Sequence, residues 1–154
     1  MNEQFRARIA DVVARILRRA VGSGTIRLAD RGNAAPGSQS WTGCVELEGG
    51  ALRISMSFSS QLATDVAAAM FALPTTGVVF ADIEDALGEL CSMVSGSLKC
   101  LVLPGCTMGL PEVVRGREDP QELEAQLLCE LPFAVDGERL YLTIAGDRYA
   151  EVAA

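Results

Sequence analysis

Residues 82–102, DIEDALGELCSMVSGSLKCLV, are the stretch from which the fold of this chain can be predicted. At 100° per residue, its large apolar residues fall on one helical stripe, formed by Ile83, Leu87, Leu90, Val94, Leu98 and Leu101. Asp85, Glu89, Ser92 and Gly96 fall on the opposite stripe. We therefore expect a long amphipathic helix that begins with Asp82 as its N-cap and ends near Leu101, before Pro104.

The stripe around Glu89 is unusual for a solvated helix face, because it and its flanks are rich in small residues: Gly88, Ser92, Ser95, Gly96 and Ser97. An interior glycine destabilises a helix by about 1 kcal/mol relative to alanine. Two interpretations are equally open. The small residues leave room for a partner or a cleft beside Glu89, or they let another element of the same fold pack there.

On the N-terminal side, the sequence predicts a helix over residues 5–20, a β-hairpin over 45–58 that turns at Gly49-Gly50, and a short helix from Ser59 or Ser60 that ends before Pro74. Residues 30–40, DRGNAAPGSQS, have the composition of an exposed loop. Trp41 is expected in the core.

On the C-terminal side, an apolar segment around residues 106–110 and a polar loop at 115–120 precede the run QELEAQLLCELPF, residues 121–133. The apolar residues of this run fit both a strand and a helix, but Asp136-Gly137 is a tight-turn dipeptide and the next residues alternate, so we expect a hairpin. The order predicts an α+β domain with an antiparallel sheet packed by long helices. Because helix followed by strands occurs twice, it also suggests internal pseudo-symmetry.

Composition is typical of one folded domain over residues 1–154, with 49% hydrophobic and 21% charged residues. No apolar stretch is long enough for membrane insertion, and a cytoplasmic location is expected. The net charge of −7 argues against nucleic acid as a partner. Residues 1–31 are locally basic, which we interpret as a solvated helix face rather than a partner site.

The chain has no histidine, so Ser-His-Asp and Cys-His catalysis are excluded. Its five cysteines contain no C-x-x-C pair, and we expect free thiols with no metal and no cofactor, with Cys91, Cys100 and Cys106 as buried structural residues. Thiol redox or metal chemistry through Cys91, Cys100 and Cys106 is the weakest of the functional alternatives.

The run from Asp82 to Val102 resembles the signature helix of the CheX branch of the CheC/CheX/FliY family of chemotaxis phosphatases, whose pattern is Asp-Ala-Leu-Gly-Glu-Leu followed by Asn-Met-Ile/Val-x-Gly and then Lys. The segments LPEVVRG (110–116) and LPFAVDGERLYLTIA (131–145) are similar to later parts of the family. The resemblance implies helices packed on one antiparallel sheet and a homodimer. It also implies that this helix binds a phosphorylated CheY-type response regulator.

In such proteins the glutamate of the pattern engages the active-site lysine of the regulator, and an asparagine three residues later orients the water that attacks the aspartyl phosphate. By resemblance, Glu89 takes the glutamate position and Ser92 the asparagine position, with Asp85, Gly96 and Lys99 as further partner-binding residues. An i, i+3 pair lies on one helix face. A serine hydroxyl reaches less far than an amide and offers fewer hydrogen bonds to water.

Whether aspartyl-phosphate phosphatase activity survives with Ser92 therefore stays open at the level of sequence. We expect a protein that docks on the regulator without efficient hydrolysis, ahead of a weak phosphatase. The alternative from a different class is a structural or oligomerisation module that buries the small-residue stripe.

Overall fold

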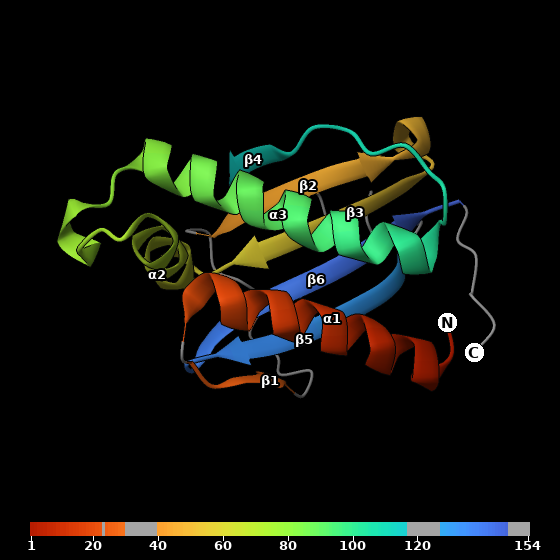
Figure 1. The fold of residues 1–154 in the computed structure, drawn as a ribbon, viewed down its shortest axis with the longest axis horizontal. Coiled ribbons are helices and arrows are strands. Elements are labelled where there is room, and N and C mark those ends of the chain that lie inside the picture. Colours follow the sequence, from red (N-terminus) through yellow and green to blue (C-terminus); the bar gives the residue numbers. More distant parts are fainter. Residues whose placement is uncertain (23, 30–39, 117–126, 148–154) are drawn as a thin grey trace.

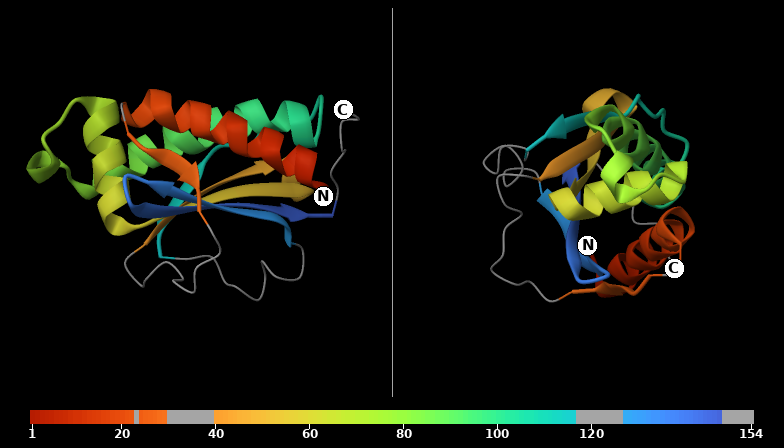
Figure 2. Two further views of the ribbon diagram at one scale, coloured as in Figure 1. Left: turned by 90° about the horizontal axis from the view of Figure 1, so that it is seen from below. Right: turned by 90° about the vertical axis from the view of Figure 1, so that its left-hand side faces the viewer.

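The described residues form one six-stranded sheet with helices on one of its faces (Figures 1 and 2). The computed structural model describes the whole chain except residues 23, 30–39, 117–126 and 148–154. Every neighbouring pair of strands is antiparallel, and the strand order is β1-β5-β6-β3-β2-β4. The strands are β1 (Ile26–Leu28), β2 (Trp41–Leu47), β3 (Leu52–Phe58), β4 (Glu112–Arg115), β5 (Leu127–Val135) and β6 (Glu138–Gly146). The helices are α1 (Glu3–Val21), α2 (Ser60–Phe71) and α3 (Phe80–Val102). The predicted α+β class is confirmed.

Both predicted hairpins are present. The β2–β3 hairpin turns through a short 3-10 segment, Glu48–Gly50, in which all three residues have positive φ. The β5–β6 hairpin turns at Asp136 (φ 50) and Gly137 (φ 83). Positive φ at two successive turn residues matches the right-handed twist of the flanking strands, which is why Asp-Gly is favoured there.

The sheet order has an internal symmetry. Exchanging β1 with β4, β2 with β5 and β3 with β6 reproduces the same order from the opposite end. The same exchange puts α1 in the place of α3. The two helices run antiparallel over the same face of the sheet, as a two-fold symmetry requires (Figure 1). Helix α2 has no counterpart within the described residues. The pseudo-symmetry suggested by the repeated order of elements is therefore visible in the topology.

Helix α3 buries the apolar stripe that its sequence predicts, apart from Leu101, which is only half-buried. The helix lies directly on β2 at Gly43, where a Cβ atom would overlap the Sγ of Cys91. Trp41 is buried as expected and packs edge-on against Phe80, with ring centroids 5.6 Å apart. The contacts with β2 fix which face of α3 points outward.

The predicted start of α3 is wrong. The helix begins at Phe80, and Asp82 lies inside its first turn, where its Oδ2 accepts a hydrogen bond from the backbone N–H of Val79 over 3.0 Å. A carboxylate in the first turn satisfies an otherwise unpaired N–H and complements the helix dipole. The same residue that looked like a cap therefore stabilises the helix from within.

Helix α2 agrees with its predicted cap. Ser59 accepts a hydrogen bond from the N–H of Leu62, and the helix ends at Phe71, before Pro74. Residues 75–77 form a 3-10 turn that leads into α3.

Strands β1 and β4 were not predicted, and each pairs with a strand distant in sequence. Of the ambiguous run 121–133, residues 127–133 are strand, which confirms the hairpin interpretation there. Residues 121–126 lie outside the described residues, as do residues 30–39 and 117–120 of the two expected loops, while Arg115 belongs to β4 and not to a loop.

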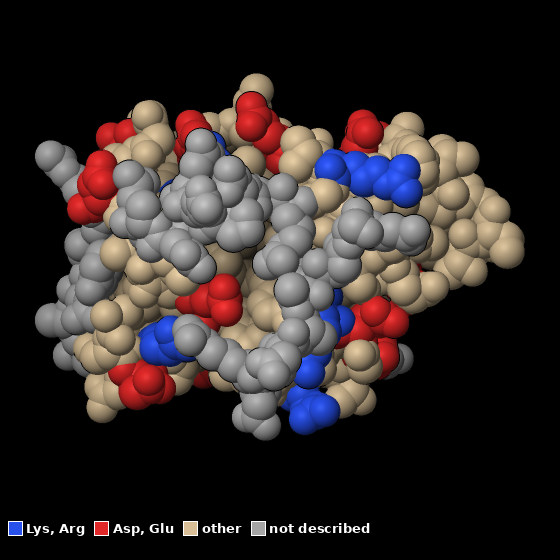
Figure 3. Space-filling view, turned by 180° about the vertical axis from the view of Figure 1, so that it is seen from behind, with Lys and Arg blue, Asp and Glu red and all other residues tan. Residues whose placement is uncertain are grey.

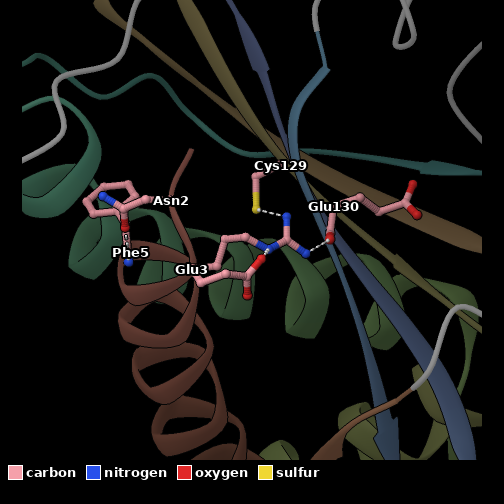
Figure 4. A network of polar contacts seen from close by, with 6 residues as sticks. Asn2, Glu3, Phe5, Cys129 and Glu130 are labelled. Atoms are coloured by element: carbon pink, nitrogen blue, oxygen red, sulfur yellow. Dashed lines mark hydrogen bonds and ion pairs between the residues drawn. The ribbon is translucent and has the colours of Figure 1, made fainter.

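Helix α1 is fixed to the sheet at its N-terminal end (Figure 4). Asn2 caps the helix by accepting a hydrogen bond from the N–H of Phe5 over 2.8 Å. The guanidinium of Arg6 donates to the backbone oxygen of Glu130 (3.1 Å) and to the Sγ of Cys129 (3.6 Å) on β5. Arg6 is therefore engaged in holding the fold together.

None of the described helices is both long and apolar enough to cross a membrane.

Candidate functional site

The predicted site residues follow the outward face of α3. Asp85 and Glu89 are exposed, while Ser92, Gly96 and Lys99 are half-buried. Glu89 and Ser92 are one turn apart on the same face. Lys99 lies about 15 Å from Glu89 along the helix axis, at 1.5 Å per residue. The fold thus brings Asp85, Glu89 and Ser92 together and leaves Lys99 at the far end of the stripe.

A shallow groove of about 310 Å³ runs beside Glu89. One wall comes from α3 and the other from the segment that leads into β4; the lining residues are Glu84, Asp85, Gly88, Glu89, Pro111 and Val113. The sequence analysis did not include Glu84, Pro111 or Val113 in the site. The β-branched pair Val113-Val114 between Pro111 and Gly116 is a strand signal that would have predicted an element here, although not what it packs against.

The charge of this surface is strongly acidic. Glu84, Asp85 and Glu89 are all exposed, and among the described residues no ion pair or hydrogen bond engages their carboxylates. Because a carboxylate accepts hydrogen bonds but cannot donate them, this face is suited to a lysine or arginine from a partner.

The two interpretations of the small residues each hold at one glycine. Gly88 is buried and faces another element of the same fold, where a Cβ would make ordinary van der Waals contact at 3.6 Å from Pro111 and 3.8 Å from Val113. Gly96 is different, because a Cβ there would have no atom of the described residues within 4 Å. The fold does not account for Gly96, which leaves open space on the outward face one turn beyond Ser92.

Replacing Gly96 by alanine is expected to raise the free energy of unfolding by about 0.5–1 kcal/mol. The substitution removes the backbone entropy penalty of a helical glycine and meets no steric obstacle. Urea denaturation of the isolated protein measures the change, with the exposed Ser97→Ala on the same helix as a calibration of intrinsic helix propensity. A loss of stability in Gly96→Ala would contradict the open surface described here.

The cysteines do not assemble a reactive centre on this face. Burial raises the pKa of the Cys91 thiol, which packs against Gly43, and burial likewise raises the pKa of the Cys106 thiol. Cys100 is exposed, so the expectation that all these thiols are buried is wrong at this position. Its place in the last turns of α3, away from the core stripe, explains the exposure. Among the described residues no cluster of metal-ligating side chains is present.

The two positions of the predicted catalytic pair supply one carboxylate, from Glu89, and one hydroxyl, from Ser92. Glu89 can bind a cation, and the Ser92 hydroxyl offers one hydrogen to donate and two lone pairs. The helix carries neither asparagine nor glutamine, so it contributes no amide near Ser92. The arrangement can hold a partner through charge, but its own means of orienting a water molecule are weak.

Comparison with known proteins places these observations in a family. The family model described as chemotaxis phosphatase CheX matches residues 41–132. The fold is similar to that of chemotaxis protein CheX from Vibrio vulnificus, with a TM-score of 0.68 and 20% identity over 92% of this chain and 95% of that one. CheX from Desulfovibrio desulfuricans has a TM-score of 0.64 and 19% identity, covering 94% and 99% of the two chains.

A third similar structure is a CheX-CheY-BeF3-Mg+2 complex from Borrelia burgdorferi, with a TM-score of 0.63 and 14% identity over 92% of this chain and 96% of that one. No curated protein sequence matches the chain. At these identities the solved structures show a shared fold.

Proposed function

Because this chain belongs to the chemotaxis phosphatase CheX family, we propose that it binds a phosphorylated CheY-type response regulator through the outward face of α3 around Glu89. The family match confirms the resemblance found in residues 82–102. One of the similar structures is a complex of a CheX with a CheY, which supports a regulator of that type as the partner.

Glu89 is the proposed centre of the contact. Its carboxylate is exposed on the outward face of α3 and has no partner among the described residues, so it is available to the active-site lysine of a regulator. Asp85 adds negative charge one turn before it, and the space above Gly96 lets the backbone of a partner approach. Lys99 is the last of the proposed partner-binding residues along the stripe.

The observation that supports the proposal about activity is Ser92 at the position where the resemblance implies an asparagine. Hydrolysis of an acyl phosphate depends mainly on positioning a water molecule and stabilising charge around phosphorus. An amide both donates and accepts on a longer stem, whereas Ser92 has a short stem and lies half-buried. We therefore propose that docking is the main function and that hydrolysis is slow.

The proposal is tested by measuring two quantities on the same set of phosphorylated CheY-type regulators: their affinity for this protein and their rate of phosphate loss. We expect measurable binding to at least one regulator, with little acceleration of phosphate loss. Strong acceleration that disappears in Glu89→Ala would show instead a phosphatase that works with serine at this position. Absence of binding to every regulator would contradict the proposal.

The proposal extends to a homodimer and to a cytoplasmic location, both of which the family resemblance implies. If the dimer leaves the α3 face open, Glu89→Arg changes regulator binding without changing the molar mass measured by light scattering. A change in molar mass with unchanged regulator binding would favour the alternative function, an oligomerisation module that buries this face.

A further inference from the structure

The outward face of α1 carries charges opposite to those of α3. Matching the buried residues of the two helices pairs Phe5 with Ala86, Ile9 with Leu90, Val13 with Val94 and Leu17 with Leu98, all at one constant shift along the chain. At that shift Arg8 takes the place of Glu89, Asp11 that of Ser92 and Arg15 that of Gly96. The pseudo-symmetric counterpart of the acidic stripe therefore carries two exposed arginines, with the exposed carboxylate of Asp11 between them.

Arg8 and Arg15 have no role in the fold that the described contacts reveal. Both side chains are exposed, and neither makes an ion pair or hydrogen bond within the described part of the chain. The other arginines of α1 are accounted for: Arg6 is bonded to β5 (Figure 4), and Arg18 and Arg19 lie in the last turn, where they complement the helix dipole.

The separation of charge by helix is specific to this side of the molecule. On the face of the sheet away from the helices, acidic and basic side chains are interspersed (Figure 3). Glu46 and Arg53 even form an ion pair over 2.9 Å between neighbouring strands. On the helical side, by contrast, the charges of α3 are mostly carboxylates, with Lys99 near its end, and the charges of α1 are mostly guanidinium groups, with Glu3 and Asp11 as its carboxylates.

The two stripes are close enough to meet one partner. Helices α1 and α3 lie side by side over the same face of the sheet (Figures 1 and 2), and packed helices have axes about 8–10 Å apart. A stable protein interface covers about 800 Å² on each partner, which corresponds to a patch about 30 Å across. A globular protein docked on Glu89 can therefore reach the outward face of α1 within one interface of ordinary size.

We propose that Arg8 and Arg15 form the second half of the regulator-docking surface. They select a regulator that presents acidic side chains beside its active-site lysine. This inference rests on the proposed function of α3 and adds which regulators are accepted. Charges at the rim of an interface act mainly on the association rate and its salt dependence. A regulator with basic side chains in that position would face Arg8 and Arg15 and be rejected.

The test measures association rate and affinity for a BeF3-activated regulator at low and high salt, with native protein, Arg8→Glu, Arg15→Glu and a control, Arg27→Glu. Arg27 is exposed on β1 at the sheet edge, so the control makes the same charge change outside the helical face. At low salt we expect Arg8→Glu and Arg15→Glu each to weaken affinity by about three- to tenfold, with a flatter salt dependence, and Arg27→Glu to have little effect.

Thermal unfolding of each variant checks that the fold is intact, and Arg15→Gln provides a milder second variant. If Glu89→Arg removes binding while Arg8→Glu and Arg15→Glu behave like Arg27→Glu, the role of α1 is overturned and the proposed function stands. If the native protein binds no regulator, the proposed function fails and this inference fails with it.

Discussion

Ser92→Asn is expected to increase the rate of phosphate loss from a bound CheY-type regulator by about a hundredfold over the native protein. Removing a group that positions the attacking water or stabilises developing charge typically lowers a rate by that factor or more. The substitution restores the amide at the position where the family pattern has it, one turn from Glu89 on the outward face of α3.

The measurement follows phosphate release from the phosphorylated regulator at saturating protein, so that a change in affinity does not affect the result. Ser97→Asn is the matched control, since it places the same amide on the same helix at an exposed position away from Glu89. The double variant Glu89→Ala with Ser92→Asn is expected to lose the gain. If Ser92→Asn accelerates no tested regulator, Ser92 is not what limits hydrolysis.

The elements that could be predicted from sequence are those with a strong local signal. The apolar stripe of residues 83–101 predicted α3, and the alternation on both sides of Asp136-Gly137 predicted the second hairpin. Strands β1 and β4 were missed because they have only three and four residues and are held by pairing with β5 and β2, which are distant in sequence. The start of α3 was misplaced because an aspartate stabilises a helix both at the N-cap and inside the first turn.

In the candidate site, too, the features that depend on local sequence could be predicted and those that depend on distant contacts could not. The spacing of Glu89 and Ser92 placed them together on one helix face, since helical periodicity is a local property. The second wall of the groove could not be predicted, because the contact of Gly88 with Pro111 depends on how β4 pairs with β2. For the same reason the sequence could not show that the arginines of α1 lie on a helix that packs beside α3.

Glu89→Arg is expected to weaken binding of a phosphorylated or BeF3-activated CheY-type regulator by about a hundredfold or more, equivalent to about 2.7 kcal/mol. The substitution replaces the carboxylate that we propose faces the active-site lysine of the regulator with a charge like that of the lysine, and such a juxtaposition at an interface destabilises a complex by several kcal/mol. Glu89 is exposed and makes no ion pair or hydrogen bond within the described residues, so we expect the variant to fold normally.

The measurement that tests the central claim most directly is a titration of one activated regulator with the native protein, Glu89→Arg and Asp147→Arg. Asp147 is an exposed carboxylate beyond the end of β6, so it controls for the change in net charge. The account predicts that binding is lost in Glu89→Arg and kept in Asp147→Arg. Equal affinity of all three proteins would contradict docking through α3.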